Sequence, residues 1–577
     1  MSLLKSTAND TVAKNVKTNM GMQNDISKDW SWGNDPNNTP SLQSEYEAVQ
    51  KSAREAELEK TRVANSLYGG GKKSAGDRLV GIVENQVGLT LFHNELKDPY
   101  VQMPIAGHKE IWSCKSKMFK RWLAKIFRET YQKTPANDAI NTAITVLEGK
   151  ASFDGPEHVL HNRIAWHDGA IWYDLADPEW RVLKITPAGW EIIIDPPILF
   201  RRYSHQRAQV EPACDGNAKE LLKFLNIQDE DQKLLLLVWV VSCFIPDFPH
   251  PIPIFYGAQG SAKSLLCKLL RKVIDPSAIE VASFPNDTNE FVQILAHHYC
   301  IFFDNVSRLP DHVSDTLCKA VTGDGFSKRE LYSDDDDIIF AFKRCLGING
   351  INLSAKNPDL LERSILFELE RVPPEQRKRE QELLQEFENE RPRIVGGIFD
   401  AVAKAMQIKP SIQLDSLPRM ADFVVWGCAI AEALGYTKKQ FLDAYYRDIK
   451  SKNEEVLYES LVATIVIELM GTRDAWEGSP SELLKEMTSL ADGLGINTTQ
   501  EREWPKAANA LSRRLNKLKT NLADAEIKVG DRVENKRRLI YLSKNSRDLS
   551  LDGNDRNDVY PDTNGAVHTS EALQENC

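Results

Sequence analysis

A short stretch in the middle of the chain carries the residue types that bind phosphate. It reads "YGAQGSAKS" from 256 to 264, and its glycine, lysine and serine positions follow the pattern G-x-x-x-x-G-K-[ST]. In such a loop, backbone N–H groups and a helix N-terminus face the phosphates, the lysine reaches the β and γ oxygens, and the serine hydroxyl binds Mg²⁺. The pattern predicts a site for ATP and Mg²⁺ formed by Gly257, Ala258, Gln259, Gly260, Ser261, Ala262, Lys263 and Ser264.

Ala262 departs from the pattern, because the position before the lysine is normally glycine. If its φ is positive, alanine costs about 1 kcal/mol relative to glycine, and if its φ is negative the cost is small. One methyl group is a weak objection, but the loop taken alone is open to a chance match. The strands that follow decide between a nucleotide site and chance.

Two polar residues stand at the ends of later apolar runs. "CIFF" leads into Asp304, and "CLGIN" ends at Asn349. The carboxyl ends of parallel strands meet at one edge of a sheet, beside the phosphate loop. Asp304 is therefore predicted to hold Mg²⁺ with Ser264, and Asn349 to orient the attacking water or to sense the γ-phosphate.

Arg363 precedes a further apolar run, "SILFEL". It is either a surface ion-pair residue or an arginine that reaches the γ-phosphate of a neighbouring subunit. The second role contributes roughly 10³–10⁵ in rate. It requires an oligomer, most simply a hexamer.

These residues need a parallel sheet that brings strand ends together. Residues 211–400 alternate apolar strand-like runs with helical patterns, which is typical of an α/β fold. The expected strands are "IPIFY", "YCIFF", "RCLGIN" and "SILFEL", and the region 401–456 is expected to be helical.

Segments of different composition precede and follow this core. Polar, Asn-rich residues at 1–75 and 544–577 predict disorder. Residues 76–210 read as a mixed α/β domain, in which Asp168 and Gly169 separate two short apolar runs and predict a β-hairpin.

Residues 457–543 predict a separate helix-rich unit with a β end. A helix is expected with Pro505 in its first turn and leucines at 511, 515, 518 and 522 on one face, followed by a two-stranded wing. Such a unit is similar to a winged helix that reads a DNA major groove, and a winged helix used only for protein packing is the alternative. The residues predicted to contact duplex DNA are Arg513, Arg514, Lys517, Lys536, Arg537 and Arg538.

The bulk composition narrows the class of protein. A formal net charge of −11 over 577 residues argues against a surface coated in basic residues, but leaves room for a basic channel. The nine cysteines form no C-x-x-C pair, which favours a reducing cytoplasm over a zinc site or a disulfide framework. The apolar run at 234–245 is too short to span a bilayer and predicts a buried helix, so no membrane partner is expected.

Five segments in order resemble one family. "GAQGSAKS", "FFDN", "TGDGFSKRELYSDDDD", "GINGI" and "PDLLERSILFEL" are similar to superfamily 3-type AAA+ helicases of phages, plasmids and integrated elements, relatives of the poxvirus-type primase-helicases. The resemblance spans residues 80–543 and is most specific over 250–370. It implies an α/β AAA+ P-loop ATPase core, a parallel sheet flanked by helices, with an N-terminal α+β domain and a C-terminal winged helix.

The resemblance has three further implications. Members often carry Ser-Ala-Lys in the loop, which makes Ala262 ordinary for the family. A β-hairpin at "TGDGFSKRELYSDDDD" would project into the channel of the ring, where Lys328 and Arg329 would grip single-stranded DNA; an exposed turn is the alternative. The residues predicted to be catalytic are Lys263, Asp304, Asn305, Asn349 and Arg363.

Two departures from the family bear on mechanism. The second acidic residue that usually ends the Mg²⁺-binding strand is Asn305 here, and an amide cannot take a proton. Either another carboxylate activates water, or hydrolysis relies on positioning and is slow. The polar segment at 1–75 is too short for the primase domain of the family, so a separate primase or polymerase is an expected partner.

The leading hypothesis is an ATP-dependent DNA helicase or replication initiator of a mobile genetic element or phage, acting as a ring. The alternative is an ATP-gated DNA-binding switch that does not unwind, which Asn305 favours. A small-molecule P-loop kinase is disfavoured, because the chain offers no lid arginine cluster and a winged helix has no purpose in such an enzyme.

Overall fold

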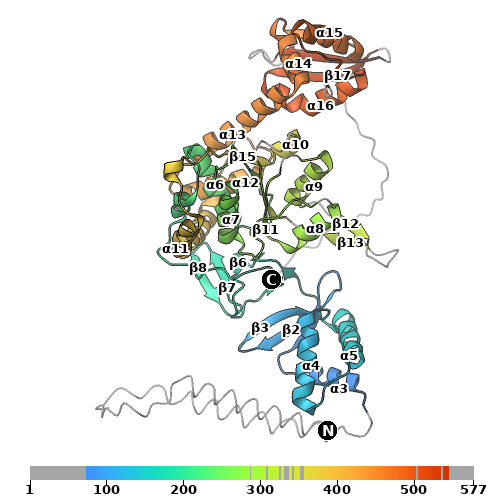
Figure 1. Ribbon diagram of the computed structural model, residues 1–577, viewed down its shortest axis with the longest axis vertical. Coiled ribbons are helices and arrows are strands. Elements are labelled where there is room, and N and C mark those ends of the chain that lie inside the picture. Colours follow the sequence, from blue (N-terminus) through green and yellow to red (C-terminus); the bar gives the residue numbers. More distant parts are fainter. Residues whose placement is uncertain are drawn as a thin grey trace, which may run out of the picture. The chain divides into compact units, whose positions relative to one another are not determined.

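The computed structural model describes residues 73–544 except 286, 307–308, 324–325, 330–336, 341–342, 351–356, 502–503 and 535–536. Almost all of the segments at 1–75 and 544–577, for which disorder is predicted, therefore lie outside the described residues. Figure 1 labels the helices and strands of the structure. The chain divides into two compact units, the first containing residues 73–86 and 126–143, the second containing residues 87–125 and 144–544.

The first unit is helical. Helix α3 (Ala75–Glu84) begins with a capping box, in which the Ser74 hydroxyl and the Asp77 carboxylate exchange bonds with backbone N–H groups. The guanidinium of Arg78 lies 5.4 Å from the centre of the Tyr131 ring. The unit also contains the second half of α4 (Lys117–Tyr131) and the first half of α5 (Asn137–Gly149).

The second unit begins with short antiparallel sheets. The predicted hairpin at Asp168–Gly169 is confirmed, since β5 and β6 pair across that turn and both turn residues have positive φ, as a two-residue hairpin turn requires. The sheets contain β1 (Thr90–His93), β2 (Pro99–Ile105) and β3 (His108–Ser113); β5 (Ile164–His167), β6 (Ala170–Asp174), β7 (Val182–Thr186) and β8 (Gly189–Ile193); and the parallel pair β4 (Leu160–His161) and β9 (Leu199–Phe200).

The strands after residue 160 share a core with the central part of the chain. Tyr173 of β6 is fully buried, and its ring packs against the rings of Phe244 and Phe399. An ion pair buried on both sides joins Arg163 to Asp275, with 2.8 Å between Nε and Oδ1. Residues 160–200 and the central sheet are therefore one packed body.

The centre of this body is a parallel sheet in the order β11-β14-β10-β15. Each of its strands lies in one of the four apolar runs from which it is predicted, and most of their residues are buried. The strands are β10 (Ile252–Tyr256), β11 (Cys300–Phe303), β14 (Cys345–Asn349) and β15 (Ser364–Glu368).

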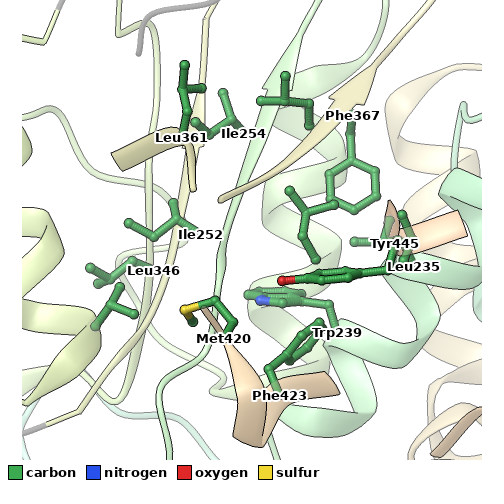
Figure 2. Packing of buried hydrophobic residues seen from close by; sticks show 14 of the residues in the cluster. Leu235, Trp239, Ile252, Ile254, Leu346, Leu361, Phe367, Met420, Phe423 and Tyr445 are labelled. Atoms are coloured by element: carbon green, nitrogen blue, oxygen red, sulfur yellow. The ribbon is translucent and has the colours of Figure 1, made fainter. Parts of the chain in front are cut away.

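Helices cover the sheet. Figure 2 shows Leu235 and Trp239 of α6 (Glu230–Ser242) packed with sheet residues such as Ile254 and Phe367. The indole of Trp239 donates to the carbonyl of Pro251 at 2.8 Å, so even this buried polar group is paired. The apolar run at 234–245 is a buried helix over its first part, as predicted. The other helices here are η2 (Ala218–Phe224), α7 (Lys263–Ile274), α8 (Thr288–His297), α9 (Asp311–Thr322) and α10 (Pro358–Leu361).

The helical region begins earlier than the predicted boundary at 401. Helix α11 (Glu380–Ile408) crosses that position and packs its buried face on the central core. Gly396 and Gly397 lie against the backbone of the 213–218 segment, where a Cβ atom would collide with main-chain atoms, so glycine allows this close approach. Helices α12 (Ala421–Ala433) and α13 (Lys438–Glu459) complete the region.

The predicted β-hairpin after α9 is present. Strand β12 (Phe326–Arg329) pairs antiparallel with β13 (Asp337–Phe340), separately from the central sheet. The side chains of Lys328 and Arg329 lie outside the described part of the structure.

The C-terminal part contains the predicted pair of strands, β17 (Ile527–Glu534) and β18 (Arg537–Lys544), which are antiparallel. A third strand, β16 (Ala475–Gly478), pairs with β18 and has no signal in the sequence analysis. The leucine stripe on α16 (Ala508–Asp524) is buried as predicted. Helices α14 (Leu461–Gly471) and α15 (Pro480–Gly493) precede it.

The predicted start of the last helix is wrong. Pro505 lies before α16, which begins at Ala508. The segment before the helix is held by the buried Trp504 side chain and by Lys506, whose ammonium donates to the carbonyls of Thr498 and Thr499. Tertiary anchoring thus outweighs the local preference for proline in a first helical turn.

No helix in the described part of the chain is both long enough and apolar enough to cross a bilayer.

Candidate nucleotide-binding site

The loop between β10 and α7 lies at the carboxyl end of the central sheet. Gly257 has φ 139°, and a Cβ atom there would collide with the carbonyl oxygen of Leu369. Gly260 has φ 80°, again in the region that favours glycine. The glycines therefore allow a turn that a side chain would prevent.

Ala262 is the residue that caps helix α7, and its conformation is left-handed, with φ 64° and ψ 24°. The sequence leaves the sign of this φ open, and the structure places it on the strained side. An alanine there costs about 1 kcal/mol relative to glycine. The loop keeps its shape despite this strain.

Lys263 folds back over the loop. Its ammonium donates to the carbonyls of Gly257 at 2.8 Å and Ala258 at 2.9 Å, and to the hydroxyl of Ser261 at 3.1 Å. Partial burial lowers the pKa of Lys263, while the carboxylate of Asp304 acts in the opposite direction. The lysine thus spans the concave side of the loop.

Ser264 and Asp304 meet directly. The Ser264 hydroxyl donates to Oδ1 of Asp304 at 2.9 Å, and the backbone N–H of Asp304 donates to Ala282 across a short parallel bridge. Hydroxyl and carboxylate oxygens are the ligands that Mg²⁺ prefers in proteins. This donor set fits a magnesium ion next to the loop.

Asn349 links three elements of the site. It is 1% exposed, its Oδ1 accepts the backbone N–H of Asn305 at 3.1 Å, and its Nδ2 donates to Sγ of Cys267 at 3.5 Å. The β14 amide therefore ties the end of β11 to helix α7. Asn305 itself has φ 57° and an exposed side chain, so it lies at the surface of the site.

The segment after β15 also lies over the loop, which the sequence analysis does not foresee. Val372 N–H donates to Gly260 O at 3.2 Å. A methyl group built on Gly260 would lie 3.8 Å from both Nε of Arg371 and Nη2 of Arg377. The exposed Arg371 has no ion-pair partner among the described residues. Two guanidinium groups thus lie beside the 257–264 loop.

Asn226 is a second residue that the sequence analysis misses. Its Nδ2 donates to the carbonyls of Ser261 at 3.1 Å and Glu370 at 2.7 Å. It therefore joins the phosphate loop to the segment that carries Arg371. Neither arginine nor Asn226 belongs to a recognisable sequence pattern, and only the fold brings them to the loop.

Arg363 is held in place by its own subunit. Its side chain is 15% exposed and forms an ion pair with Asp359, 2.6 Å between Nη1 and Oδ1. Arg419 pairs with Asp359 and with Glu362 on the outer side. To reach a neighbour's nucleotide, Arg363 would have to exchange Asp359 for the phosphate.

The predicted DNA-binding residues of the C-terminal part lie on two elements. Arg513 and Lys517 are exposed on α16, with Arg514 half-buried beside them. Arg537 and Arg538 are exposed at the start of β18, and Arg538 pairs with Asp531 at 2.9 Å. Lys536 lies outside the described residues.

Comparison with known families places the chain among mobile-element replication proteins. Residues 218–454 match the family described as actinomycete integrative conjugative element replication protein, and residues 462–556 match the AICE RepA C-terminal domain. The two matched segments follow one another and together span more than half of the chain. A search of curated proteins returns no match.

Solved structures similar to the chain include the C-terminal region of NrS-1 in apo form. One such structure has 14% sequence identity and a TM-score of 0.37, covering 81% of this chain and 98% of its own. Another has 15% identity and a TM-score of 0.36, covering 82% of this chain and all of its own.

Proposed function

We propose that this chain, which is similar to the replication proteins of integrative conjugative elements, is an ATP-driven DNA motor that acts in the replication of such an element. The observation that carries the proposal is the bond between Ser264 and Asp304 beside Lys263. A lysine, a hydroxyl and a carboxylate at one end of a parallel sheet suit the phosphates and Mg²⁺ of a nucleotide.

The proposal gives a role to the residues of the loop that bear polar side chains and to the residues around it. Bound Mg²⁺·ATP supplies the phosphoanhydride bond that is broken. Lys263 would exchange its three loop oxygens for phosphate oxygens, and Ser264 and Asp304 would hold the metal. Arg371 and Arg377 add positive charge from the other side of the loop. Asn349 fixes the end of β11, so that Asp304 keeps its position.

A AAA+-type core is the fold that this proposal assumes. The sheet order β11-β14-β10-β15 with the phosphate loop after β10 supports it. In a ring of subunits, most simply a hexamer, Arg363 would act on the nucleotide of the neighbour. The hairpin of β12 and β13 would contact single-stranded DNA in the channel.

The C-terminal part would bind duplex DNA. The order α14, β16, α15, α16, β17, β18 is that of a winged helix, with α16 in the place of the recognition helix. Arg513, Arg514 and Lys517 on α16 and Arg537 on β18 would contact DNA. A separate primase or polymerase would complete replication.

Strand displacement on a forked DNA duplex tests the motor. We expect unwinding with Mg²⁺ and ATP, and its loss in Lys263→Ala, because the lysine is the cation at the loop. Lys404→Ala, an exposed lysine on α11, is the matched control and should unwind like the wild type. Equal unwinding by wild type and Lys263→Ala would rule out the motor.

A nucleotide-gated DNA switch is the second candidate, and Asn305 favours it. An amide follows Asp304 where a carboxylate would activate water, so ATP binding without fast turnover would suffice. Negligible hydrolysis together with a DNA affinity that responds to a non-hydrolysable ATP analogue would select the switch.

A further inference from the structure

A second pocket, of about 460 Å³, lies away from the phosphate loop. One wall is formed by the paired strands β4 and β9 and the residues after β9, including His161, Arg201 and Tyr203, and the other by Lys343 and Arg344 before β14. Asn162, next to His161, donates to the carbonyl of His297 at the end of α8 at 3.1 Å, so the first wall is bonded to that helix. The volume is within the range of about 300–1,000 Å³ that is usual for small-ligand sites.

Arg201 lines this pocket and also forms a side-chain hydrogen bond with Tyr100. Its guanidinium lies 4.7 Å from the centre of the Tyr203 ring and 5.6 Å from that of Tyr100. No carboxylate pairs with Arg201 among the residues that the structure describes. Aromatic rings cover the faces of a guanidinium but leave its in-plane N–H groups free to bind a planar pair of anionic oxygens. An arginine held in this way is suited to a phosphate.

Tyr203, whose ring lies next to Arg201, is itself packed on a histidine ring. The ring of Tyr203 lies 4.5 Å from that of His297, and His205 stacks on His298 at 3.7 Å. Burial is the main cause that lowers the pKa of His297 to about 4 and that of His298 to about 3, with nearby arginines acting in the same direction. These imidazoles are therefore neutral at pH 7 and do not supply the charge of the pocket.

The opposite wall adds two cations. The Lys343 ammonium donates to the carbonyl of Asp247 at 2.8 Å, and Arg344 donates to the carbonyl of Leu295 at 2.7 Å. Burial lowers the pKa of Arg344 to about 10, which leaves it charged at pH 7. The carboxylates on the lining are Glu95 and Asp247, both exposed, so the pocket holds more positive than negative groups.

The pocket lies at the base of the β12–β13 hairpin. Gly323 and Lys343 both line it, and they precede and follow the hairpin along the chain. A ligand here would contact the protein next to the element that the proposed motor uses on DNA. The phosphate chemistry and this location point to one kind of ligand.

We propose that this pocket binds one nucleotide unit of single-stranded DNA, with a phosphate on Arg201 and Lys343. The identity of the ligand as DNA rests on the proposed function, whereas the phosphate site rests on the pocket itself. Free nucleotides have the same phosphate chemistry, and the experiment separates the two sources.

Fluorescence anisotropy of the full chain with a labelled oligothymidylate, without ATP, tests the proposal. We expect Arg201→Gln to weaken binding about tenfold and to lower the log–log salt slope by about one unit, because one phosphate contact is lost. Arg201→Lys should keep the slope but recover only part of the affinity, since a lysine lacks the fork geometry. Arg207→Gln, an exposed arginine on the same segment outside the pocket, should bind like the wild type.

The outcomes are distinct. Equal affinities for Arg201→Gln and Arg207→Gln would overturn the proposal. Calorimetry with thymidine monophosphate identifies the source: if Arg201→Gln loses this binding and keeps that of the strand, a free nucleotide occupies the pocket and the DNA assignment is wrong. In the wild type, an oligonucleotide with 4-thiothymidine should crosslink to the peptide that contains Tyr203, a result that does not depend on the folding of any variant.

The same anisotropy in a Lys263→Ala background separates this site from the motor. If the pocket binds DNA, Arg201→Gln should also weaken binding of the oligonucleotide in the Lys263→Ala background, even though nucleotide binding at the phosphate loop is lost. If Lys263→Ala leaves unwinding intact, the proposed motor function is wrong. The measurement of strand binding at the pocket is not affected by that outcome.

Discussion

The hydroxyl of Ser264 donates a hydrogen bond of 2.9 Å to the carboxylate of Asp304, joining the first turn of α7 to the end of β11. Between the two residues lie the rest of α7, a connecting segment, α8 and β11, so the fold of the sheet and its helices brings them together. Both oxygens are of the kind that Mg²⁺ binds, and the ammonium of Lys263 lies on the adjoining loop.

Asp304→Asn should therefore reduce the affinity for Mg²⁺·ATP at least about tenfold, because the amide lacks the charge that holds the metal. Binding of a fluorescent ATP analogue, with and without Mg²⁺, measures the effect. Asp422→Asn, an exposed acid on α12, is the control. An unchanged affinity in Asp304→Asn would remove this residue from the site.

Arg363→Ala should leave ATP binding intact and reduce ATP hydrolysis by a factor of about 10³ or more, as expected for an arginine that acts across a subunit boundary. Arg419→Ala removes the outer partner of Asp359 without touching Arg363, and should retain hydrolysis. Mixing Arg363→Ala with Lys263→Ala subunits should restore some activity, since each variant then lacks a different half of one site. Failure of the mixture to hydrolyse ATP would favour a role within the subunit.

Ala262→Gly should raise the free energy of unfolding by about 1 kcal/mol, because glycine adopts φ 64° without the strain of a Cβ atom. Ala258→Gly is the matched control in the same loop; its φ is not positive, so glycine there should bring no gain. Thermal unfolding of the two variants beside the wild type gives the comparison. A loss of stability in Ala262→Gly would show that the methyl group makes a contact worth more than the strain.

Arg371→Ala should weaken ATP binding about tenfold, because a guanidinium close to the phosphate loop is removed. The effect should be larger for ATP than for AMP, which carries fewer phosphates. Arg379→Ala is a suitable control, as this arginine is highly exposed and pairs only loosely with Glu382 at 3.7 Å. If both variants bind ATP alike, Arg371 has no part in the site.

The predictable part of the site is the part with a local signal. Apolar runs and a glycine-rich loop predict β10, β11, β14 and β15, and each of these strands lies within its predicted run. Arg371 and Asn226 carry no such signal, since an arginine after a strand and an asparagine before a helix are common anywhere. Arg371 reaches the loop because β15 lies beside β10 in the sheet, and Asn226 reaches it from the segment before α6.

The spacing of residues in the sequence also does not predict backbone conformation or the burial of side chains. The sign of φ at Ala262 depends on how the loop meets α7, and Pro505 is displaced from its helix by the anchoring of Trp504 and Lys506. Arg163 and Asp275 are far apart in the sequence, and the sequence by itself would place both charges at the surface. The structure shows that the two side chains form a fully buried ion pair.

Asp275→Asn should destabilise the protein by about 3 kcal/mol or more, because it leaves two buried guanidinium groups without their carboxylate. The carboxylate lies between Arg163 and Arg271, and it also accepts the backbone N–H of Cys300. Burial by itself would raise the pKa of Asp275, but the two arginines lower it to about 2 from a usual value of 3.8. Unfolding by urea at pH 7 measures the loss, and Asp195→Asn, which removes an exposed ion pair with Lys109, should cost at most about 1 kcal/mol.

The pH dependence follows from the direction of this shift. Since the folded-state pKa of Asp275 is depressed, its contribution is present above pH 3.8 and is lost as the pH falls toward 2, where the folded carboxyl also takes a proton. The lowered pKa values of His297 and His298 reduce the stability of the folded state at higher pH, below about 6.5, because the unfolded imidazoles take up protons there and the folded ones do not. Wild type should thus lose stability in both ranges, whereas Asp275→Asn should lack the lower one. An acid-unfolding curve of Asp275→Asn that still falls between pH 4 and 2 as steeply as that of the wild type would contradict the assignment of the buried carboxylate.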